Sequence, residues 1–264
     1  MFDDCVVGFP DRLSIEGVDC GRYELASGET LKPSQPRGIL EGDGVNRSIR
    51  VTRRQIIGMS VAAGALSSAA SMALAKALGA TPPQVQGPFY PREKPTDQDA
   101  DLTYVADRTE RAAGQVIQLR GRVLGPEGEP IAGARVEIWQ ANANGRYAHP
   151  NDSNPAPLDP NFQGYASLVT DAEGRFRVTT IKPGAYPMNS RTMRPPHIHF
   201  DIRSKVSHLI TQMYFKGEPL NEDDYILQRA GSNADRLIVP FQPAPTQLES
   251  GTLVGEWDVV LGRG

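Results

Sequence analysis

The sequence predicts an all-β fold, an antiparallel β-sandwich with long loops, preceded by a signal segment. Short segments rich in Val, Ile, Thr and aromatic residues alternate with turn residues throughout the C-terminal part of the chain. No internal repeat, heptad pattern or long amphipathic helix competes with them in the sequence. An Ala-rich run around residue 60 differs from this part in composition. The chain is therefore expected to contain one sandwich domain behind a segment of another kind.

The segment before the predicted domain has the pattern of an export signal. Arg53 and Arg54 precede an uncharged, Ala-rich run over 56–75, and residues 73–77 offer the small-x-small pattern of signal-peptidase sites. We therefore expect residues 51–80 to be a twin-arginine-type signal and the mature protein to be periplasmic or secreted. No stable membrane span is expected after processing. An uncleaved anchor and a mobile Ala-rich helix are the alternatives.

The remaining residues divide into an extension and one folded domain. Residues 1–50 are expected to be an N-terminal extension, either disordered or the result of a wrongly assigned start. Residues 81–264 are long enough to bury a substantial core and form the predicted domain. Its first part, 81–109, is rich in Pro and Asp, so we expect an arm on the surface.

The strands of the domain follow from the same alternation. Asn144-Gly145 favours a tight turn, and residues 171–174, which read DAEG, predict a hairpin between their flanking strands. The Pro- and Asn-rich segment 148–164 predicts a long loop of the kind that carries function. The predicted strands span residues 115–124, 134–141, 164–170, 175–181, 197–203, 208–216, 236–241 and 253–261.

Composition limits the chemistry that the domain can carry. The formal net charge is -3, and 28 Lys+Arg are spread among 31 Asp+Glu without a basic stripe, so no nucleic-acid partner is expected. The only cysteines are Cys5 and Cys20, which precede the domain. Any metal site in the domain must therefore use His, Tyr, Asp or Glu.

A His-x-His pattern is the first candidate for a metal site. Successive side chains of a strand point to opposite faces, so His197 and His199 share one face and can reach one ion. Pro195 and Pro196 keep the preceding chain extended, which places Arg194 beside whatever the histidines bind. A pair of exposed strand histidines is the alternative.

Two tyrosines at predicted strand ends are the second candidate. Tyr147 follows the Asn-Gly turn, and Tyr186 follows the strand at 175–181. A phenolate is a hard anionic ligand that suits ferric iron. The alternative for each is a buried packing tyrosine with a bonded hydroxyl.

Several segments together resemble the intradiol ring-cleavage dioxygenases, and within that family its protocatechuate branch. The resemblance covers most of residues 116–220 and implies that 81–264 is a catalytic β-sandwich domain. It also implies an oxidoreductase that inserts both atoms of O2 into a protocatechuate-like catechol to give a cis,cis-muconate. The segments are GRVLGPEGEPIAGARVEIWQANANGRYAHPND, PLDPNFQGYASLVTDAEGRFRVTTIKPGAYP, RPPHIHF and LITQMYFKGEPL.

The resemblance assigns a role to each candidate residue. Tyr186 matches the ligand that leaves the metal when substrate binds and accepts a substrate proton. Arg194 matches the arginine that stabilises negative charge on the ring, and Gln212 matches a glutamine that positions substrate. The implied partners are a catechol and O2, with a homo-oligomer or an iron-free partner chain as further expectations. The implied ligands of a non-haem Fe(III) are Tyr147, Tyr186, His197 and His199.

Two other functions remain open from the sequence. Exported β-sandwich binding modules share the strand and turn pattern but lack the tyrosines with His-x-His. A 2-His-1-carboxylate Fe(II) oxygenase would use His197, His199 and a carboxylate such as Asp201. His149 and Asp152 follow Tyr147 and are either solvated loop residues or substrate contacts.

Overall fold

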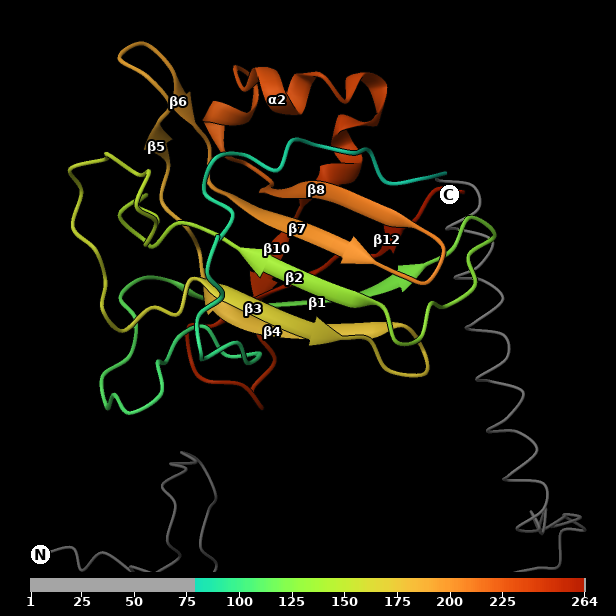
Figure 1. Ribbon diagram of the computed structural model, residues 1–264, viewed down its shortest axis with the longest axis horizontal. Helices are drawn as coiled ribbons and strands as arrows, with labels where there is room; N and C mark the ends of the chain where they lie inside the picture. Colours follow the sequence, from blue (N-terminus) through green and yellow to red (C-terminus); the bar gives the residue numbers. More distant parts are fainter. Residues whose placement is uncertain (1–78, 264) are drawn as a thin grey trace, which may run out of the picture. The chain divides into compact units, whose positions relative to one another are not determined.

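A computed structural model of the protein describes residues 79–263 (Figure 1). The predicted extension 1–50 and almost all of the predicted signal segment 51–80 lie outside these residues. The described part is mostly β, with few and short helices. These are η1 (Pro219–Asn221), α2 (Tyr225–Gln228) and η2 (Gly231–Leu237). The strands are β1 (Val116–Leu124), β2 (Arg135–Trp139), β3 (Tyr165–Val169), β4 (Arg175–Ile181), β5 (Tyr186–Pro187), β6 (Met193–Arg194), β7 (His197–Arg203), β8 (His208–Phe215), β9 (Ile238–Val239), β10 (Phe241–Pro243), β11 (Leu253–Glu256) and β12 (Val259–Val260).

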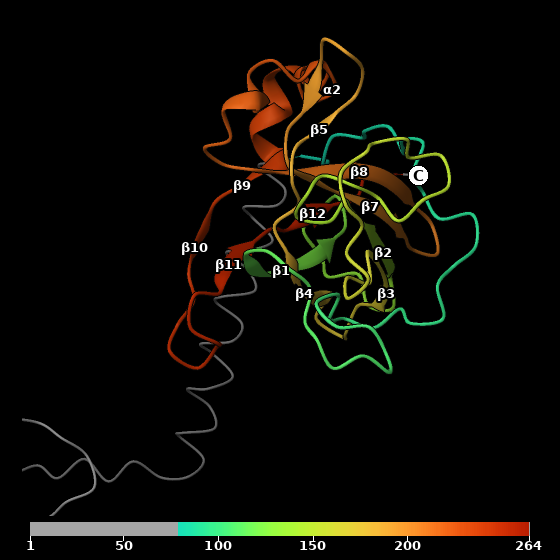
Figure 2. The same cartoon turned by 90° about the vertical axis from the view of Figure 1, so that its left-hand side faces the viewer.

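Two five-stranded sheets enclose the core, which confirms the predicted sandwich (Figures 1 and 2). One sheet has the order β10-β11-β1-β12, with β4 also paired to β1, and the other has the order β3-β2-β7-β8-β9. Aromatic side chains meet between them: the Phe200 ring lies 6.3 Å from Phe176 and 5.0 Å from Trp257, centroid to centroid. β5 and β6 form a separate two-stranded hairpin.

The prediction of a purely antiparallel sandwich is wrong, because both sheets are mixed. β1 runs parallel to β11 and to β12, and β8 runs parallel to β9. The parallel partners of β1 lie more than 100 residues further along the chain, as in the pair Ile117 and Leu253. Strand direction at such a distance depends on the path of the connection, which alternation of apolar residues does not encode.

The predicted hairpin around residues 171–174 is also wrong. β3 pairs with β2 and β4 pairs with β1, so the turn crosses from one sheet to the other. The Gly174 amide donates to the Asp171 carbonyl at 3.0 Å, so the tight turn itself is present. A Cβ at Gly174 would lie 2.6 Å from the Val123 carbonyl oxygen. Alternation and turn residues are the same for a hairpin and for a sandwich corner, so the sequence could not separate the two.

The last two predicted strands are each interrupted. Residues 236–241 contain the end of η2, β9 and the start of β10, and residues 253–261 are divided between β11 and β12 at Trp257. The Trp257 indole donates to the Arg236 carbonyl at 2.9 Å, and its amide donates to the Arg120 carbonyl at 2.9 Å. The bulky side chain thus turns inward and breaks the regular pairing.

The arm before β1 lies across the sandwich and is not simply a surface segment (Figure 1). The Gln84 amide donates to Ile210 of β8, and the Thr211 hydroxyl donates to the Pro82 carbonyl, each at 2.8 Å. Further along, Leu102 is completely buried in the core. The arm is therefore hydrogen-bonded to β8 and also contributes a side chain to the core.

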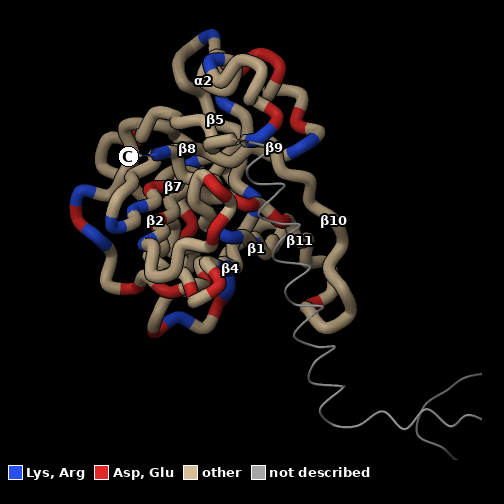
Figure 3. The backbone as a smooth tube through the Cα atoms, turned by 90° about the vertical axis from the view of Figure 1, so that its right-hand side faces the viewer, with Lys and Arg blue, Asp and Glu red and all other residues tan. Residues whose placement is uncertain are grey.

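Both signs of charge are interspersed along the described chain, in keeping with the small formal net charge of -3 (Figure 3). Between residues 79 and 263, no helix is both long and apolar enough to cross a membrane.

Candidate active site

The two histidines of the His-x-His pattern converge on one point, as the alternation of a strand predicts. His197 and His199 lie in β7 on the face opposite the core, and their Nε2 atoms are 3.2 Å apart. His197 Nδ1 lies 2.7 Å from the Pro195 carbonyl oxygen. Because a carbonyl can only accept, Nδ1 carries the proton and His197 Nε2 carries the lone pair. At least one imidazole lone pair is thus directed into the space between the rings.

The His199 ring is confined by a stacked aromatic ring and by the backbone of the arm. Trp139 of β2 stacks on it with a centroid distance of 4.8 Å and an interplanar angle of 9°. Gly87 of the arm approaches from another direction, and a Cβ there would lie 3.2 Å from His199 Cε1. Gly87 has a φ of 75°, in the left-handed region that glycine adopts without strain.

Both histidines are held in the neutral form. Burial, together with the positive charge of Arg194, holds the pKa of His199 well below its usual range. The same two causes, and the neighbouring His199, lower the pKa of His197. A neutral imidazole is the form that binds a metal ion.

The two tyrosines meet beside the histidines, although they come from different loops. The Tyr147 and Tyr186 ring centroids are 5.5 Å apart at nearly a right angle. Tyr186 Oη lies 3.5 Å from His197 Nε2, and the Tyr147 ring lies 6.2 Å from that of His199. All four predicted metal ligands therefore gather in one place.

Local hydrogen bonds explain how the loop presents Tyr147. Asn142 Oδ1 accepts from backbone amides of the following turn at 2.9 and 3.0 Å. Gly145 in that turn has a φ of 75°, and a Cβ there would lie 2.2 Å from the Ala185 carbonyl oxygen. The two tyrosine-bearing loops therefore touch through a glycine. The Tyr147 amide donates to Asp152 at 2.7 Å, which gives this loop carboxylate a supporting role.

Both tyrosine hydroxyls are buried, and that of Tyr147 lacks a hydrogen-bond partner among the described residues. Burial, reinforced by the Tyr186 hydroxyl, raises the pKa of Tyr147 well above its usual range. Burial also raises the pKa of Tyr186, and the charge of Arg194 partly opposes this rise. Among the described residues, Tyr147 Oη has no hydrogen-bond partner of standard length. A buried hydroxyl without a partner is costly, and a cation between the four side chains would resolve it by binding the phenolate.

Arg194 lies next to this group, at the end of β6, opposite Tyr186 in the β5–β6 hairpin. Its Nε donates to Asp224 at 2.5 Å, and its Nη2 donates to Gln212 at 2.8 Å and to the Tyr214 hydroxyl at 3.1 Å. The side chain of Arg194 is only 4% exposed. The predicted neighbour of the histidines is therefore a buried, tightly held cation.

Gln212 uses both ends of its amide within the protein. Oε1 accepts from Arg194 and, at 3.0 Å, from the Tyr214 hydroxyl. Nε2 donates to the Val85 carbonyl of the arm at 2.8 Å. In this arrangement Gln212 joins Arg194 to the arm, and its predicted contact with substrate stays a prediction.

Sequence reasoning missed several residues of the site. Phe89 of the arm stacks on Tyr147 with a centroid distance of 4.6 Å, and Asp224 and Tyr214 hold Arg194. The only signal for Asp224 is its position as a helix N-cap residue before a very short helix. For Phe89 the sequence carries no local signal, because its place depends on the path of the arm.

The predicted carboxylate of an Fe(II) site is engaged elsewhere. Asp201 accepts two hydrogen bonds from Arg203 at 2.9 Å and lies 2.9 Å from His208 Nε2. Within residues 79–263, no three His, Cys, Asp or Glu side chains are grouped so that they could hold a metal ion. The donor set around the histidines is completed by tyrosines and not by Asp201.

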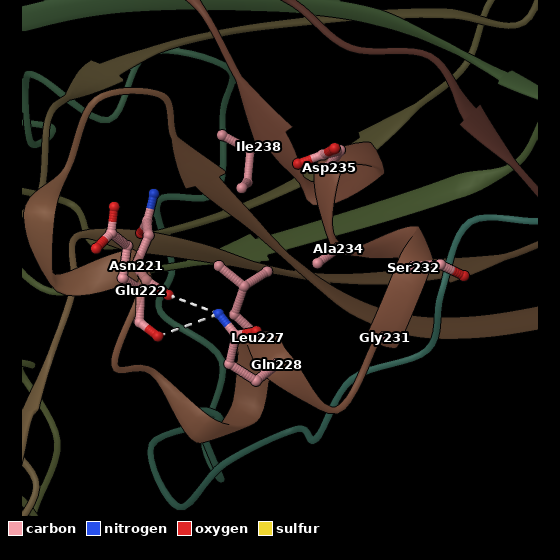
Figure 4. A pocket seen from close by; sticks show the side chains of 9 residues that line it. All are labelled: Asn221, Glu222, Leu227, Gln228, Gly231, Ser232, Ala234, Asp235 and Ile238. Carbon is pink, nitrogen blue, oxygen red and sulfur yellow. Dashed lines mark hydrogen bonds between the residues drawn. The ribbon is translucent and has the colours of Figure 1, made fainter.

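An open pocket of about 350 Å³ lies elsewhere in the described chain, between η1, α2 and η2 (Figure 4). Its lining combines apolar side chains with two carboxylates. None of its lining residues belongs to the predicted site. They are Asn221, Glu222, Leu227, Gln228, Gly231, Ser232, Ala234, Asp235 and Ile238.

A mixed sandwich with a buried set of two phenols and two neutral imidazoles defines a candidate non-haem metal centre. Comparison with known proteins shows the family to which the chain belongs. Residues 85–262 match the family described as dioxygenase. The chain is 46% identical over 179 residues to the protocatechuate 3,4-dioxygenase beta chain of Burkholderia cepacia, a match that covers 66% of this chain and 76% of that one. It is 29% identical over 203 residues to a chlorocatechol 1,2-dioxygenase of Pseudomonas sp. (strain P51), covering 72% and 73%.

Solved structures show the same fold. The dioxygenase domain of a dioxygenase carbohydrate-binding protein fusion from Streptomyces sp. SirexAA-E matches with a TM-score of 0.53 and 27% identity, over 70% of this chain and 99% of that one. The 3-chlorocatechol 1,2-dioxygenase of Rhodococcus opacus 1CP matches with a TM-score of 0.57 at 21% identity, over 81% and 91%.

The chain therefore belongs to the intradiol ring-cleavage dioxygenases. It is an oxidoreductase that cleaves the ring of an aromatic diol with incorporation of O2.

Proposed function

We propose that the chain binds a ferric ion through Tyr147, Tyr186, His197 and His199. The observation that carries this proposal is the meeting of the histidine Nε2 atoms, 3.2 Å apart, with the unpaired Tyr147 hydroxyl. Two phenolates and two neutral imidazoles suit Fe(III) in charge and in hardness. When bound, the ion would withdraw electron density from a chelated catecholate, so that a ring carbon can react with O2.

The protein side chains would supply orientation, proton acceptance and charge stabilisation. Tyr186 would accept the proton of the second catechol hydroxyl at its phenolate oxygen. Its high pKa, raised by burial, favours the protonated state once the phenolate is released. Arg194 would stabilise negative charge that develops on the ring, because its charge is buried and already oriented.

We further propose a protocatechuate-like catechol as substrate and a cis,cis-muconate as product. The support is the similarity to a protocatechuate 3,4-dioxygenase beta chain, which exceeds that to the chlorocatechol enzyme. Phe89 and Tyr186, with ring centroids 6.1 Å apart, provide apolar and aromatic surface beside the site for a planar ring.

The direct test is product analysis under ¹⁸O₂ with protocatechuate, with catechol as the comparison substrate. We expect a carboxymuconate with one labelled oxygen in each of the two new carboxyl groups. A hydroxymuconic semialdehyde would reveal cleavage outside the diol. Turnover of catechol in preference to protocatechuate would overturn the substrate proposal and leave the family assignment intact.

Export by the twin-arginine route is also part of the proposal, motivated by Arg53, Arg54 and the Ala-rich run that follows. N-terminal sequencing of protein recovered from the producing cells tests it. A mature chain that begins near residue 80 supports export, and a chain that retains Arg53 contradicts it. Mass measurement of the same sample would show whether the chain forms a homo-oligomer or carries a partner chain.

A further inference from the structure

We infer that Asp224 is a positioning residue that sets the orientation of the Arg194 guanidinium and ties it to the start of α2. The inference rests on the proposed function, because it concerns how the charge of Arg194 is presented to a substrate. Asp224 lies in neither of the two tyrosine-bearing loops, and it is 30 residues away from Arg194 in the sequence.

The carboxylate of Asp224 is divided between two tasks. Oδ1 accepts from the Leu227 amide at 2.7 Å and thereby caps α2, whereas Oδ2 accepts from Arg194 Nε at 2.5 Å. The side chain of Asp224 is 1% exposed, so water does not compete for either oxygen. The cap orients the carboxylate, and its second oxygen in turn holds Arg194 Nε through a charge-assisted hydrogen bond.

The hydrogen bonds that hold Arg194 use two of its three nitrogens. Nε donates to Asp224, and Nη2 donates to Gln212 and Tyr214. None of these bonds uses Nη1, and the Tyr186 hydroxyl is the further neighbour on which the guanidinium acts. Nη1 is thus the nitrogen that remains for an anionic group on a substrate.

The pairing of β5 with β6 places Arg194 beside Tyr186, the residue proposed to accept the substrate proton. Tyr186 and Arg194 are directly opposite in that hairpin, and the Arg194 charge acts on the Tyr186 hydroxyl. A rotation of the guanidinium would move the charge relative to the ring of a substrate bound beside Tyr186. Misplacement of about 1 Å can reduce a rate by roughly 100-fold.

The test variant is Asp224→Asn, with Asp223→Asn as the matched control. Asn caps helices as well as Asp does, so α2 should remain intact. If its Oδ1 keeps the bond to Leu227, its amide NH2 faces the N–H of Arg194 Nε, and two donors repel. Asp223 is the exposed neighbour, and its substitution makes the same change in charge.

We expect Asp224→Asn to lower kcat per bound iron about 100-fold, with iron content and resting visible spectrum close to those of the unmodified protein. Thermal unfolding should occur at a lower temperature, because the buried Arg194 loses its counterion. Asp223→Asn should leave all four quantities unchanged. In the Arg194→Lys background, Asp224→Asn should have less than a threefold effect on kcat, because the two residues act as one unit.

Three results would overturn the inference. The first is a kcat per iron within threefold of the unmodified protein. The second is a loss of activity explained entirely by lost iron or lost stability, which would make Asp224 merely structural. The third is an equally large effect of Asp224→Asn in the Arg194→Lys background. Absence of iron and turnover in the unmodified protein would instead refute the proposed function, so the two failures are distinguishable.

Discussion

The protonation states of the two histidines and two tyrosines follow from their individual contacts and burial. The Pro195 carbonyl assigns the proton of His197 to Nδ1, which leaves Nε2 as a donor to a metal ion. Burial favours neutral His199 and protonated phenols, so the four donor side chains by themselves carry no net charge. A ferric ion would reverse the state of the phenols, because its charge stabilises the phenolate more strongly than burial destabilises it.

Tyr147→Phe should abolish turnover, with at least a 100-fold loss, and remove most of the visible absorption of the iron-loaded protein. The physical reason is the loss of a phenolate ligand whose charge transfer to ferric iron gives the colour. Tyr165→Phe is the matched control, since Tyr165 is equally buried and lies in the same aromatic cluster. A coloured and active Tyr147→Phe protein would show that Tyr147 is a packing residue.

His199→Gln should lower the iron bound per chain by at least tenfold after dialysis, as measured by metal analysis. The fixed ring presents its nitrogen to the site, and an amide is a weak replacement for it. His208→Gln is the control, because His208 is 45% exposed and pairs with Asp201 instead. Equal iron content in the two variants would contradict the assignment of His199.

The site residues that could be predicted from the sequence were those indicated by strand alternation or by the family resemblance. The shared face of His197 and His199 follows from strand geometry alone. The approach of Tyr147 to Tyr186 required the family resemblance, because the two residues lie in separate loops. Asp224 was missed, since a short segment remote in sequence from Arg194 gives no local pattern.

The arm before β1 covers one side of the candidate site, where its residues contact Tyr147 and His199. It is tied to β8 by backbone and side-chain hydrogen bonds, and its Phe89 stacks on Tyr147. Lys94 and Tyr90 attach the next part of the arm to Glu137 of β2, at 3.1 and 2.5 Å. The arm therefore forms one side of the candidate site.

Gly87→Ala tests this role of the arm. The methyl group would lie 3.2 Å from His199 Cε1 and displace either the arm or the ring, so we expect weaker iron binding and an altered visible spectrum. Gly217→Ala is the control, because Gly217 also has a positive φ of 86° but nothing within 4 Å of its Cβ position. Both changes should cost about 1 kcal/mol in the free energy of unfolding through backbone strain. Normal iron binding by Gly87→Ala would show that the contact between the arm and His199 does not affect the metal site.

Strand positions were predictable at the element scale, whereas strand partners were not. The predicted segments 175–181 and 197–203 coincide with β4 and β7. The alternation of apolar residues predicts which face of a strand is buried. It does not distinguish two strands paired in a hairpin from two strands that lie in different sheets. The parallel partners of β1 and the sheet change at 171–174 depend on tertiary packing, so they lay beyond the sequence pattern.

The whole molecule responds to pH through the buried donor set. In the iron-free protein the pKa of His197 and the pKa of His199 are held low by burial, whereas unfolded histidine titrates near pH 6.5. As pH falls below about 6.5, these two histidines bind protons in the unfolded chain but stay neutral in the folded chain. Each histidine should then reduce the free energy of unfolding by up to about 1.4 kcal/mol per pH unit.

Chemical denaturation of iron-free protein between pH 7.5 and pH 5 measures this dependence. His199→Gln should show a slope smaller by about 1.4 kcal/mol per pH unit than that of the unmodified protein, because it lacks one of the two groups. An identical slope in both proteins would mean that His199 titrates normally in the folded state.

The identity of the metal centre is tested most directly by the visible absorption spectrum of the aerobically purified protein, recorded before and after anaerobic addition of protocatechuate. We expect a broad phenolate-to-Fe(III) band that shifts when the catechol binds. A colourless protein with stoichiometric iron and no change on addition of substrate would contradict ligation by Tyr147 and Tyr186.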